Sequence, residues 1–351
     1  MKQKPTDRVE KWLCLILFTF FAFCWLYFFQ QDLICASVRE ISNKGGDLYG
    51  PRPHLHLIVS VLLTAFASLW VIPVRKILHF KKGTYAASYF VSALFLGLIT
   101  GFDGNSLFGQ SYAVWIASFV FVVVLLLVCM AVSSVPKSDY FERPRTIAGN
   151  LLIMSLLFSL VGFLGNTDEN LHRRLRMEHL YAEGKYNELL DVGRMEEESD
   201  HSIDLLRAKA LLNIPFDANP LGSMIGERLF EFSISDPVSL SKELAKLDNA
   251  QAYLVSCLLT GNIDSFRDSI NLKDYSVVPK YFMQALVLAH DNAAMTLFSR
   301  QFKAEQLLLE SFTDKLEPIK DKPQSYRANS TFIDYHSTYY WYSFFRTGYH
   351  N

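Results

Sequence analysis

The sequence lacks the motifs that usually mark an active site. It contains no glycine-rich phosphate loop, no Gly-x-Ser-x-Gly elbow and no His-Glu-x-x-His zinc motif. Cysteine is scarce, with five residues in a chain of 351. Three of the five, Cys14, Cys24 and Cys129, fall in apolar runs, where a thiol behaves as a small hydrophobic side chain. The absences disfavour an enzyme, and the sequence predicts no catalytic residue, no cofactor and no metal site.

Few polar clusters remain as alternatives. His54 and His56 have no Cys, Asp or Glu close in sequence, so they are too few to hold a metal ion. His172 and His179 are two helical turns apart, and packing or surface roles explain them. A disulfide between Cys35 and Cys257 is neither required nor excluded by their spacing.

Charged residues are also missing from four long stretches. No Asp, Glu, Lys or Arg occurs inside 12–31, 83–102, 104–136 or 146–167. Each stretch offers about 20 or more residues, enough for a helix to cross a hydrocarbon layer of about 30 Å. A further apolar run, 55–74, lies between the first and second of these stretches. The sequence therefore predicts that domain 1–165 is a bundle of five transmembrane helices, near 12–31, 55–74, 84–102, 110–134 and 146–165.

The first run has one alternative reading. The basic residues before it could be the start of a cleaved signal peptide. The apolar part is longer and more aromatic than a usual signal core, and no clear Ala-x-Ala site follows. Cys35 is a poor lipoprotein acceptor because Asp32 stands where an aliphatic residue is needed. A retained anchor is the expected outcome.

Lysine and arginine are unevenly distributed between the loops. The N-terminus has four, the loop between the second and third spans four, and the loop between the fourth and fifth three. The loops on the other side have three in all. Since cations resist translocation, the N-terminus is expected in the cytoplasm and everything after about residue 166 outside. The predicted topology accounts for the cationic loops. Membrane lipids are therefore expected as partners, and nucleic acid is not.

No predicted span has an ionisable residue near its centre, which disfavours transport and proton relay. The third span carries Ala93, Gly97 and Gly101 at intervals of four residues. Small residues so spaced allow close helix packing. They serve either the protein's own bundle or the interface of a homo-oligomer.

Residues 166–315 have the composition of a soluble helical domain. A helix closes at Gly184 and a second one starts near Tyr186, and the same plan recurs around Gly261 with Phe266 in the second helix. The two glycines are 77 residues apart, about two helical hairpins of 38 residues each. Each hairpin would expose an apolar face until the next one stacks on it.

This pattern resembles the tetratricopeptide arrangement, in which a glycine closes the first helix and an aromatic residue opens the second. The segment with Pro215 and Pro220 departs from it, before a helix expected near 221–232. Another hairpin is expected after Pro279, at a position typical of an early helical residue. The predicted fold is all-α, a transmembrane bundle followed by an irregular helical repeat.

The N-terminal spans, the segments LGSMIGERLFEF and VVPKYFMQALVLA, and the aromatic tail together resemble an uncharacterised family of Bacteroidota polytopic membrane proteins. The resemblance implies an inner-membrane location and a periplasmic domain. It implies no catalytic residues.

Residues 316–351 consist of a polar connector, expected as an exposed arm, and an aromatic segment. The segment's candidate packing or interaction residues are Tyr339, Tyr340, Trp341, Tyr342, Phe344 and Phe345. It is too short and polar for a sixth span. It could cap the open end of the repeat, lie at the membrane surface, or bind a partner.

These features predict a membrane-anchored helical-repeat protein that acts as an interaction or scaffold module for another envelope protein. A lipid or small-molecule carrier is the alternative. An envelope enzyme is a third, which would need a site assembled only in three dimensions.

Overall fold

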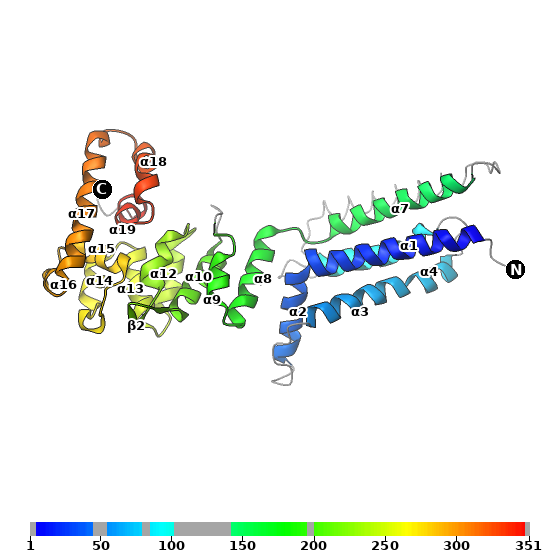
Figure 1. Cartoon of the computed structure of the whole chain (residues 1–351), viewed down its shortest axis with the longest axis horizontal. Helices are drawn as coiled ribbons and strands as arrows, with labels where there is room; N and C mark the ends of the chain where they lie inside the picture. Colours follow the sequence, from blue (N-terminus) through cyan, green and yellow to red (C-terminus); the bar gives the residue numbers. More distant parts are fainter. Residues whose placement is uncertain (1–4, 45–54, 79–84, 102–141, 195–199, 348–351) are drawn as a thin grey trace. The chain divides into compact units, whose positions relative to one another are not determined.

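The computed structural model describes residues 5–44, 55–78, 85–101, 142–194 and 200–347. The chain divides into two compact units, Met1–Leu175 and Arg176–Asn351. The described residues are almost all helical, which confirms the all-α class (Figure 1). The exception is a small antiparallel hairpin formed by β1 (Pro215–Phe216) and β2 (Asn219–Ser223).

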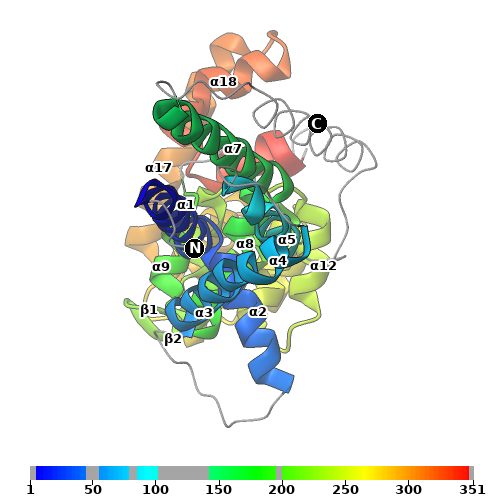
Figure 2. The ribbon, with the colours of Figure 1, turned by 90° about the vertical axis from the view of Figure 1, so that its right-hand side faces the viewer.

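The first unit consists of apolar helices. They are α1 (Pro5–Cys24), continued by a π-helical turn η1 (Trp25–Phe29), α2 (Gln31–Lys44), α3 (Leu55–Leu69), α4 (Val71–Leu78), the 3-10 turn η2 (Ala86–Tyr89), α5 (Phe90–Thr100) and α7 (Glu142–Leu164). Figure 2 shows α1, α3, α5 and α7 grouped together, and each of the four packs on two of the others around a common apolar core.

Three helices in the described part of the chain are long and apolar enough to cross a membrane, not the five that the sequence predicts. They are Arg8–Phe29, His56–Lys76 and Ile147–Leu164. The predicted third span corresponds to Ala86–Thr100, an apolar helix that is shorter than a full crossing. The charge-free stretch is longer than the helix, which begins after Tyr85 and ends before Gly101. The predicted fourth span, 110–134, lies outside the described residues.

Contacts between side chains fix the direction of each helix. The N–H of Ala86 donates to Oδ1 of Asn150 at 3.0 Å near the start of α5. At its other end, Gly97 lies against Leu164, the last residue of α7, so the two helices are parallel. Phe21 of α1 stacks on Phe158 of α7, with ring centroids 3.9 Å apart.

Helix α3 runs in the opposite direction. Tyr27, at the end of the first span, stacks on His56 at the start of α3. Thr19 and Ser68 share a hydroxyl hydrogen bond of 3.1 Å at the other end of the pair. The ends of α1, α5 and α7 therefore meet at one end of the bundle, together with the start of α3.

The small-residue stripe of α5 is used inside the bundle. Ala93 is fully buried, and a Cβ atom on Gly97 would come within 2.7 Å of the Leu164 side chain. Gly101, also buried, ends the helix. Gly97 therefore permits close packing of α5 on α7.

The second unit is a succession of short helices (Figure 1). They are α8 (Glu169–Ala182), which begins in the first unit, α9 (Tyr186–Asp191), α10 (His201–Asn213), α11 (Ile225–Arg228), η3 (Leu229–Glu231), α12 (Pro237–Ala245), α13 (Ala250–Leu259), α14 (Ile263–Ser269), η4 (Leu272–Asp274), α15 (Lys280–Leu288), α16 (Asn292–Leu297), α17 (Ser299–Leu316), η5 (Glu317–Ile319), α18 (Gln324–Tyr335), α19 (Tyr339–Tyr342) and η6 (Ser343–Thr347).

Three helical hairpins in this series are closed by the same turn. Gly184 and Gly261 both have φ of +72°, and His290 has φ of 49°. After each, the next N–H bonds back to a carbonyl five residues earlier, as in Lys185 to Leu180 at 2.9 Å and Asp291 to Leu286 at 3.0 Å. This is the Schellman arrangement, which satisfies carbonyls at a helix end. The third hairpin, expected after Pro279, thus uses histidine where the other two use glycine.

Two segments differ from the sequence prediction. The helix expected over 221–232 is a strand up to Ser223, followed by the single helical turn Ile225–Arg228. Asn219 holds the strand hairpin in place, since its side chain donates to the Asp274 carbonyl at 3.2 Å. The polar connector expected as an exposed arm is largely helical, in α17 and α18.

Candidate functional site: the aromatic C-terminal segment

The aromatic segment folds back into the core of the second unit as the short helix α19 and the turn η6. Thr338 begins the helix, and its hydroxyl oxygen accepts from the N–H of Trp341 at 3.2 Å. A threonine at this position satisfies an N–H group that the first helical turn leaves unpaired. The segment then presents two different faces.

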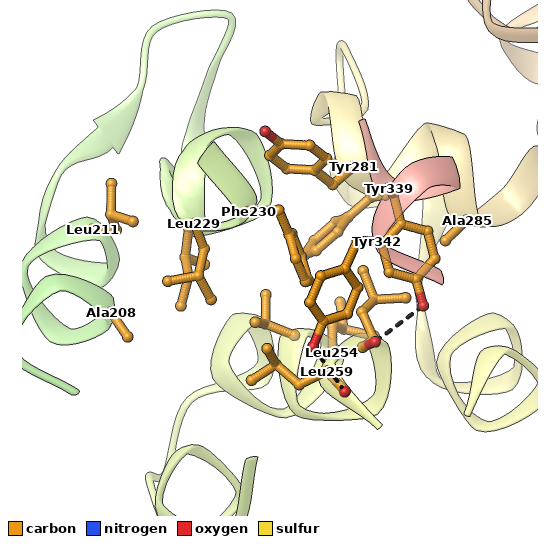
Figure 3. Packing of buried hydrophobic residues seen from close by; sticks show 14 of the residues in the cluster. Ala208, Leu211, Leu229, Phe230, Leu254, Leu259, Tyr281, Ala285, Tyr339 and Tyr342 are labelled. Atoms are coloured by element: carbon orange, nitrogen blue, oxygen red, sulfur yellow. Dashed lines mark hydrogen bonds between the residues drawn. The ribbon is translucent and has the colours of Figure 1, made fainter. Parts of the chain in front are cut away.

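The inward face carries three tyrosines. Tyr339, Tyr340 and Tyr342 are all buried, with exposed fractions of 0%, 1% and 7%. The hydroxyl of Tyr339 donates to the carbonyl of Leu258 at 3.0 Å, and that of Tyr342 to the carbonyl of Leu259 at 3.1 Å (Figure 3). Of the three readings of the segment, packing within the domain is the one observed for these residues.

The two acceptor carbonyls are at the C-terminal end of α13. A helix leaves its last carbonyls without partners in the helix, and burying them unpaired would be costly. The tyrosine hydroxyls donate to these carbonyls from a segment more than 80 residues further along the chain, and the carbonyl of Leu258 also accepts from the N–H of Gly261 at 3.2 Å. Thr347 also approaches this helix end, since a Cβ atom on Gly261 would lie 2.9 Å from its side chain.

Polar side chains of α15 and α17 hold the segment's backbone. Nζ of Lys280 donates to the carbonyl of Ser337 at 2.7 Å. The N–H of Tyr339 donates to Oε1 of Gln284 at 2.6 Å, while Nε2 of Gln284 donates to Glu305 at 2.9 Å. Gln284 is fully buried, so both ends of its amide are used in the core.

Phe230 is the centre of the inward packing. Its ring lies 5.4 Å from that of Tyr339, 4.7 Å from that of Tyr342 and 5.1 Å from that of Tyr281, each edge to face (Figure 3). Aromatic pairs favour this geometry. Sequence reasoning missed Phe230, Tyr281 and Gln284. In the sequence these residues are marked only by lying in apolar or helical segments, as many other residues of the chain do.

The outward face carries the other rings of the segment. Trp341, Phe344 and Phe345 are partly buried. Trp341 contacts Phe345 and Phe332 of α18, while Phe344 contacts Phe345 and the buried ring of Phe312. We call Trp341, Phe344, Phe345 and Phe332, with His336 stacked on Phe332, the aromatic ladder. Phe332 is 48% exposed. The ladder therefore offers ring surface to the outside of the domain.

The ladder is held in place by its own hydrogen bonds. The indole N–H of Trp341 donates to the carbonyl of Ala328 at 3.3 Å, and Nδ1 of His336 lies 2.9 Å from the carbonyl of Phe332. The indole N–H is thus already used within the domain. What the ladder presents to a ligand is chiefly apolar ring surface.

Two arginines accompany the ladder. The guanidinium of Arg327 lies over the ring of Phe344, 5.6 Å from its centroid. Arg346 follows Phe345 and is exposed. Neither arginine forms an ion pair with any carboxylate of the described residues. Arg327 therefore adds positive charge beside the ring of Phe344.

Burial keeps the inward hydroxyls protonated. Loss of solvent raises the pKa of Tyr340 and Tyr342 above the ordinary tyrosine value. The neutral hydroxyl remains a hydrogen-bond donor at physiological pH. The pKa of Tyr281 is raised for the same reason, but its buried hydroxyl has no hydrogen-bond partner.

The remaining sequence candidates lie apart from this face. Tyr186 packs on Tyr181 beside Gly184, and Phe266 is fully buried against Phe282. Cys257 is buried in the core of the second unit. His54 lies outside the described residues.

The other histidine candidates are held by local contacts. His56 stacks on Tyr27, and His179 lies 3.4 Å from the carboxylate of Glu183. Over the described ranges, no group of three or more His, Cys, Asp or Glu is placed to hold a metal ion.

No protein family, curated protein or solved structure matches this chain. Its function must therefore be inferred from its own geometry.

Proposed function

We propose that this protein is a membrane-anchored scaffold whose outer helical domain binds another envelope protein through the aromatic ladder. The membrane part crosses the bacterial inner membrane five times, with the N-terminus in the cytoplasm and the second unit in the periplasm. The three long apolar helices and the distribution of Lys and Arg support this arrangement.

The directions of the helices support an odd number of crossings. The ends of α5 and α7 meet, since the N–H of Asn166 donates to the carbonyl of Thr100 at 2.8 Å. The chain thus leaves α5 at the end opposite to the one at which it enters α7. The proposed topology therefore needs one more crossing between them, and the apolar run 110–134 in the sequence can provide it.

The closing turns at Gly184, Gly261 and His290 support a repeat of helical hairpins, as in tetratricopeptide-like proteins. Such domains build extended surfaces from successive hairpins and commonly bind peptides or helices. The unequal lengths of the hairpins fit an irregular repeat.

The observation that carries the proposal is the partly exposed rings of the ladder, with the Arg327 guanidinium over Phe344 and the exposed Arg346 next to Phe345 in the chain, neither of which pairs with a carboxylate among the described residues. Tryptophan, tyrosine, phenylalanine and arginine are the residues that most often dominate binding energy at protein interfaces. Because the ladder is fixed by internal hydrogen bonds, little conformational entropy is lost when it binds. Its partner is expected to present apolar side chains flanked by carboxylates, which match Arg327 and Arg346.

The test is cross-linking in native membranes followed by affinity purification of the full chain. We expect one protein at near-equal yield with the wild type, and a loss of at least tenfold with Phe332→Ser or Arg327→Glu. The matched control is Leu297→Ala, which changes a side chain that is 58% exposed on α16. The control variant should retain the partner.

Thermal unfolding of each variant checks that the domain remains folded. A partner captured equally by all the variants would move the binding surface away from the ladder. The absence of any near-stoichiometric protein would contradict the scaffold function itself.

A further inference from the structure

One side of α1 carries a continuous exposed ridge. Arg8, Trp12, Ile16 and Phe20 follow one another at intervals of four residues, so each lies one helical turn after the last on the same side of the helix. Trp12, Ile16 and Phe20 are 60%, 62% and 69% exposed, and Arg8 is exposed as well. The helices that the structure describes therefore leave this ridge uncovered.

The ridge has the length of one leaflet of a membrane. Arg8 and Phe20 are separated by about 18 Å along an α-helix, and Trp12 and Phe20 by about 12 Å. One leaflet supplies about half of a hydrocarbon layer of about 30 Å. The apolar part of the ridge therefore fits within one leaflet, and Arg8 lies at the level of the headgroups. A phospholipid has the same order of parts, a charged headgroup followed by an apolar chain.

Two further cations lie at the charged end of the ridge. Lys11 is exposed next to it. The hydroxyl oxygens of Thr19 and Ser68 are 3.1 Å apart, which aligns α1 with the antiparallel helix His56–Lys76 (Figure 1). Lys11 and Lys76 each lie about 12 Å from this hydrogen bond in the direction of the N-terminus of α1. They are therefore at the same level of the bundle.

These cations are not neutralised by the described residues. Arg8, Lys11 and Lys76 are exposed and form no ion pair with any carboxylate in that part of the chain. The acidic residues of the first turns are Asp7 and Glu10. The side chain of Glu10 is buried, at 7% exposure, and lies on the opposite side of α1 from Trp12. The ridge therefore ends in positive charge that an anion can contact.

Trp12 is suited to the boundary between headgroups and chains. Tryptophan is enriched at this level of membranes because its ring is apolar while its N–H needs an acceptor. The Trp12 indole N–H has no acceptor among the described residues. An ester or phosphate oxygen of a lipid can supply one.

We propose that this ridge binds one anionic phospholipid of the adjacent leaflet. Its phosphate lies between Arg8 and Lys11, its glycerol region lies beside Trp12, and one acyl chain lies along Ile16 and Phe20. A guanidinium group matches the geometry of a phosphate, and each further cation at the membrane surface favours an anionic headgroup. The proposal rests on the membrane insertion of the first unit, which is part of the proposed function, but not on its orientation or on the aromatic ladder.

Native mass spectrometry of the full chain tests the proposal. The protein in detergent is mixed with equal amounts of phosphatidylglycerol and phosphatidylcholine that have the same acyl chains. We expect one phosphatidylglycerol molecule to be retained, with a preference of at least tenfold over phosphatidylcholine. The double variant Arg8→Gln, Lys11→Gln should lower this preference by about tenfold, because each cation near the surface contributes several-fold to the binding of anionic lipid.

The matched control is the double variant Arg300→Gln, Lys303→Gln. It removes another exposed arginine and lysine with the same spacing, on α17. This variant should keep the preference of the wild type. Glycerol phosphate in tenfold excess should not displace the lipid, because it has no acyl chain for Ile16 and Phe20. Displacement would indicate a site for free phosphate and overturn the assignment to a lipid.

Flotation with lipid vesicles first shows whether the chain inserts into a bilayer. A chain that does not float would contradict both the membrane part of the proposed function and this site. A chain that floats but retains the two lipids equally would overturn the lipid site alone. So would an Arg8→Gln, Lys11→Gln variant with the same preference as the wild type.

Discussion

The hydroxyl of Tyr339 closes the C-terminal end of α13 by donating to the carbonyl of Leu258, 81 residues earlier in the sequence. Tyr342 does the same for the adjacent carbonyl of Leu259. The last elements of the chain are therefore part of the domain's core. Damage to this segment should be felt in the stability of the whole second unit.

Replacing Tyr339 by phenylalanine should lower the free energy of unfolding of the second unit by about 1 kcal/mol or more. The change removes a donor from a buried carbonyl while leaving the ring packing intact. Tyr281→Phe is the matched control, since this hydroxyl is equally buried and has no partner. The control should be neutral or stabilising. Urea-dependent proteolysis of the full-length protein measures both, and equal losses would contradict the assigned hydrogen bond.

Alanine at Gly261 should be more damaging than alanine at Gly184. Both positions have φ of +72°, so each substitution costs about 1–2 kcal/mol in backbone strain. A new Cβ atom at Gly184 meets nothing within 4 Å, whereas one at Gly261 lies 2.9 Å from Thr347. We expect an additional loss of about 1 kcal/mol at Gly261, with faster cleavage near the C-terminus. Similar losses for the two variants would mean that Thr347 does not rest on this turn.

In the first unit, Gly165→Ala should destabilise the helical bundle while Gly162→Ala should not. The first substitution forces a methyl group against Trp25 and Thr100, at 2.5 Å and 3.0 Å. The second, earlier in α7, meets nothing within 4 Å and improves helix propensity. Thermal inactivation in detergent should show a lower melting temperature for the first variant only. A drop in both would indicate a general intolerance of α7.

Glu227 gives the second unit a defined pH dependence. Burial raises the pKa of its carboxyl above the ordinary value, although the bond from the Lys280 N–H opposes this. A raised folded-state pKa means that stability from this group is present below the unfolded-state pKa and is lost as the pH rises through the folded-state pKa. Glu227→Gln keeps an acceptor for Lys280.

Stability of the Glu227→Gln variant should therefore exceed that of the wild type at pH 7 by less than about 1 kcal/mol, since the group is only partly buried. The difference should disappear as the pH falls towards 4.5. Unfolding followed at several pH values measures it. A constant difference over the whole range would point to a packing effect in place of titration.

The proposed orientation predicts which side of the membrane each unit faces. In a chain lacking Cys35, a cysteine replacing Ile333, which is 84% exposed, should react with an impermeant thiol reagent once the outer membrane is opened. A cysteine replacing Lys76 should react only after the inner membrane is disrupted. The reverse pattern would invert the topology.

Local sequence patterns were sufficient for much of the fold. The three long apolar helices follow from stretches without charge, because a hydrocarbon layer excludes ions along a helix of fixed rise. The turns at Gly184 and Gly261 could be predicted because glycine takes a positive φ without strain. The residue that closes the turn at His290 could not be predicted. The same hydrogen bonds stabilise this turn, but histidine, unlike glycine, does not indicate a positive φ.

The sequence by itself determined the helical class, the long apolar helices and the presence of an aromatic terminus, since each is a property of neighbouring residues. Only the tertiary structure decided how that terminus is used. Tyr339 and Tyr342 turn inward, where their hydroxyls donate to carbonyls at the end of α13 and their rings pack on Phe230. Trp341 turns outward because its N–H finds the Ala328 carbonyl at the surface. These partners are distant in sequence, so no local pattern could show which aromatic residue would meet which.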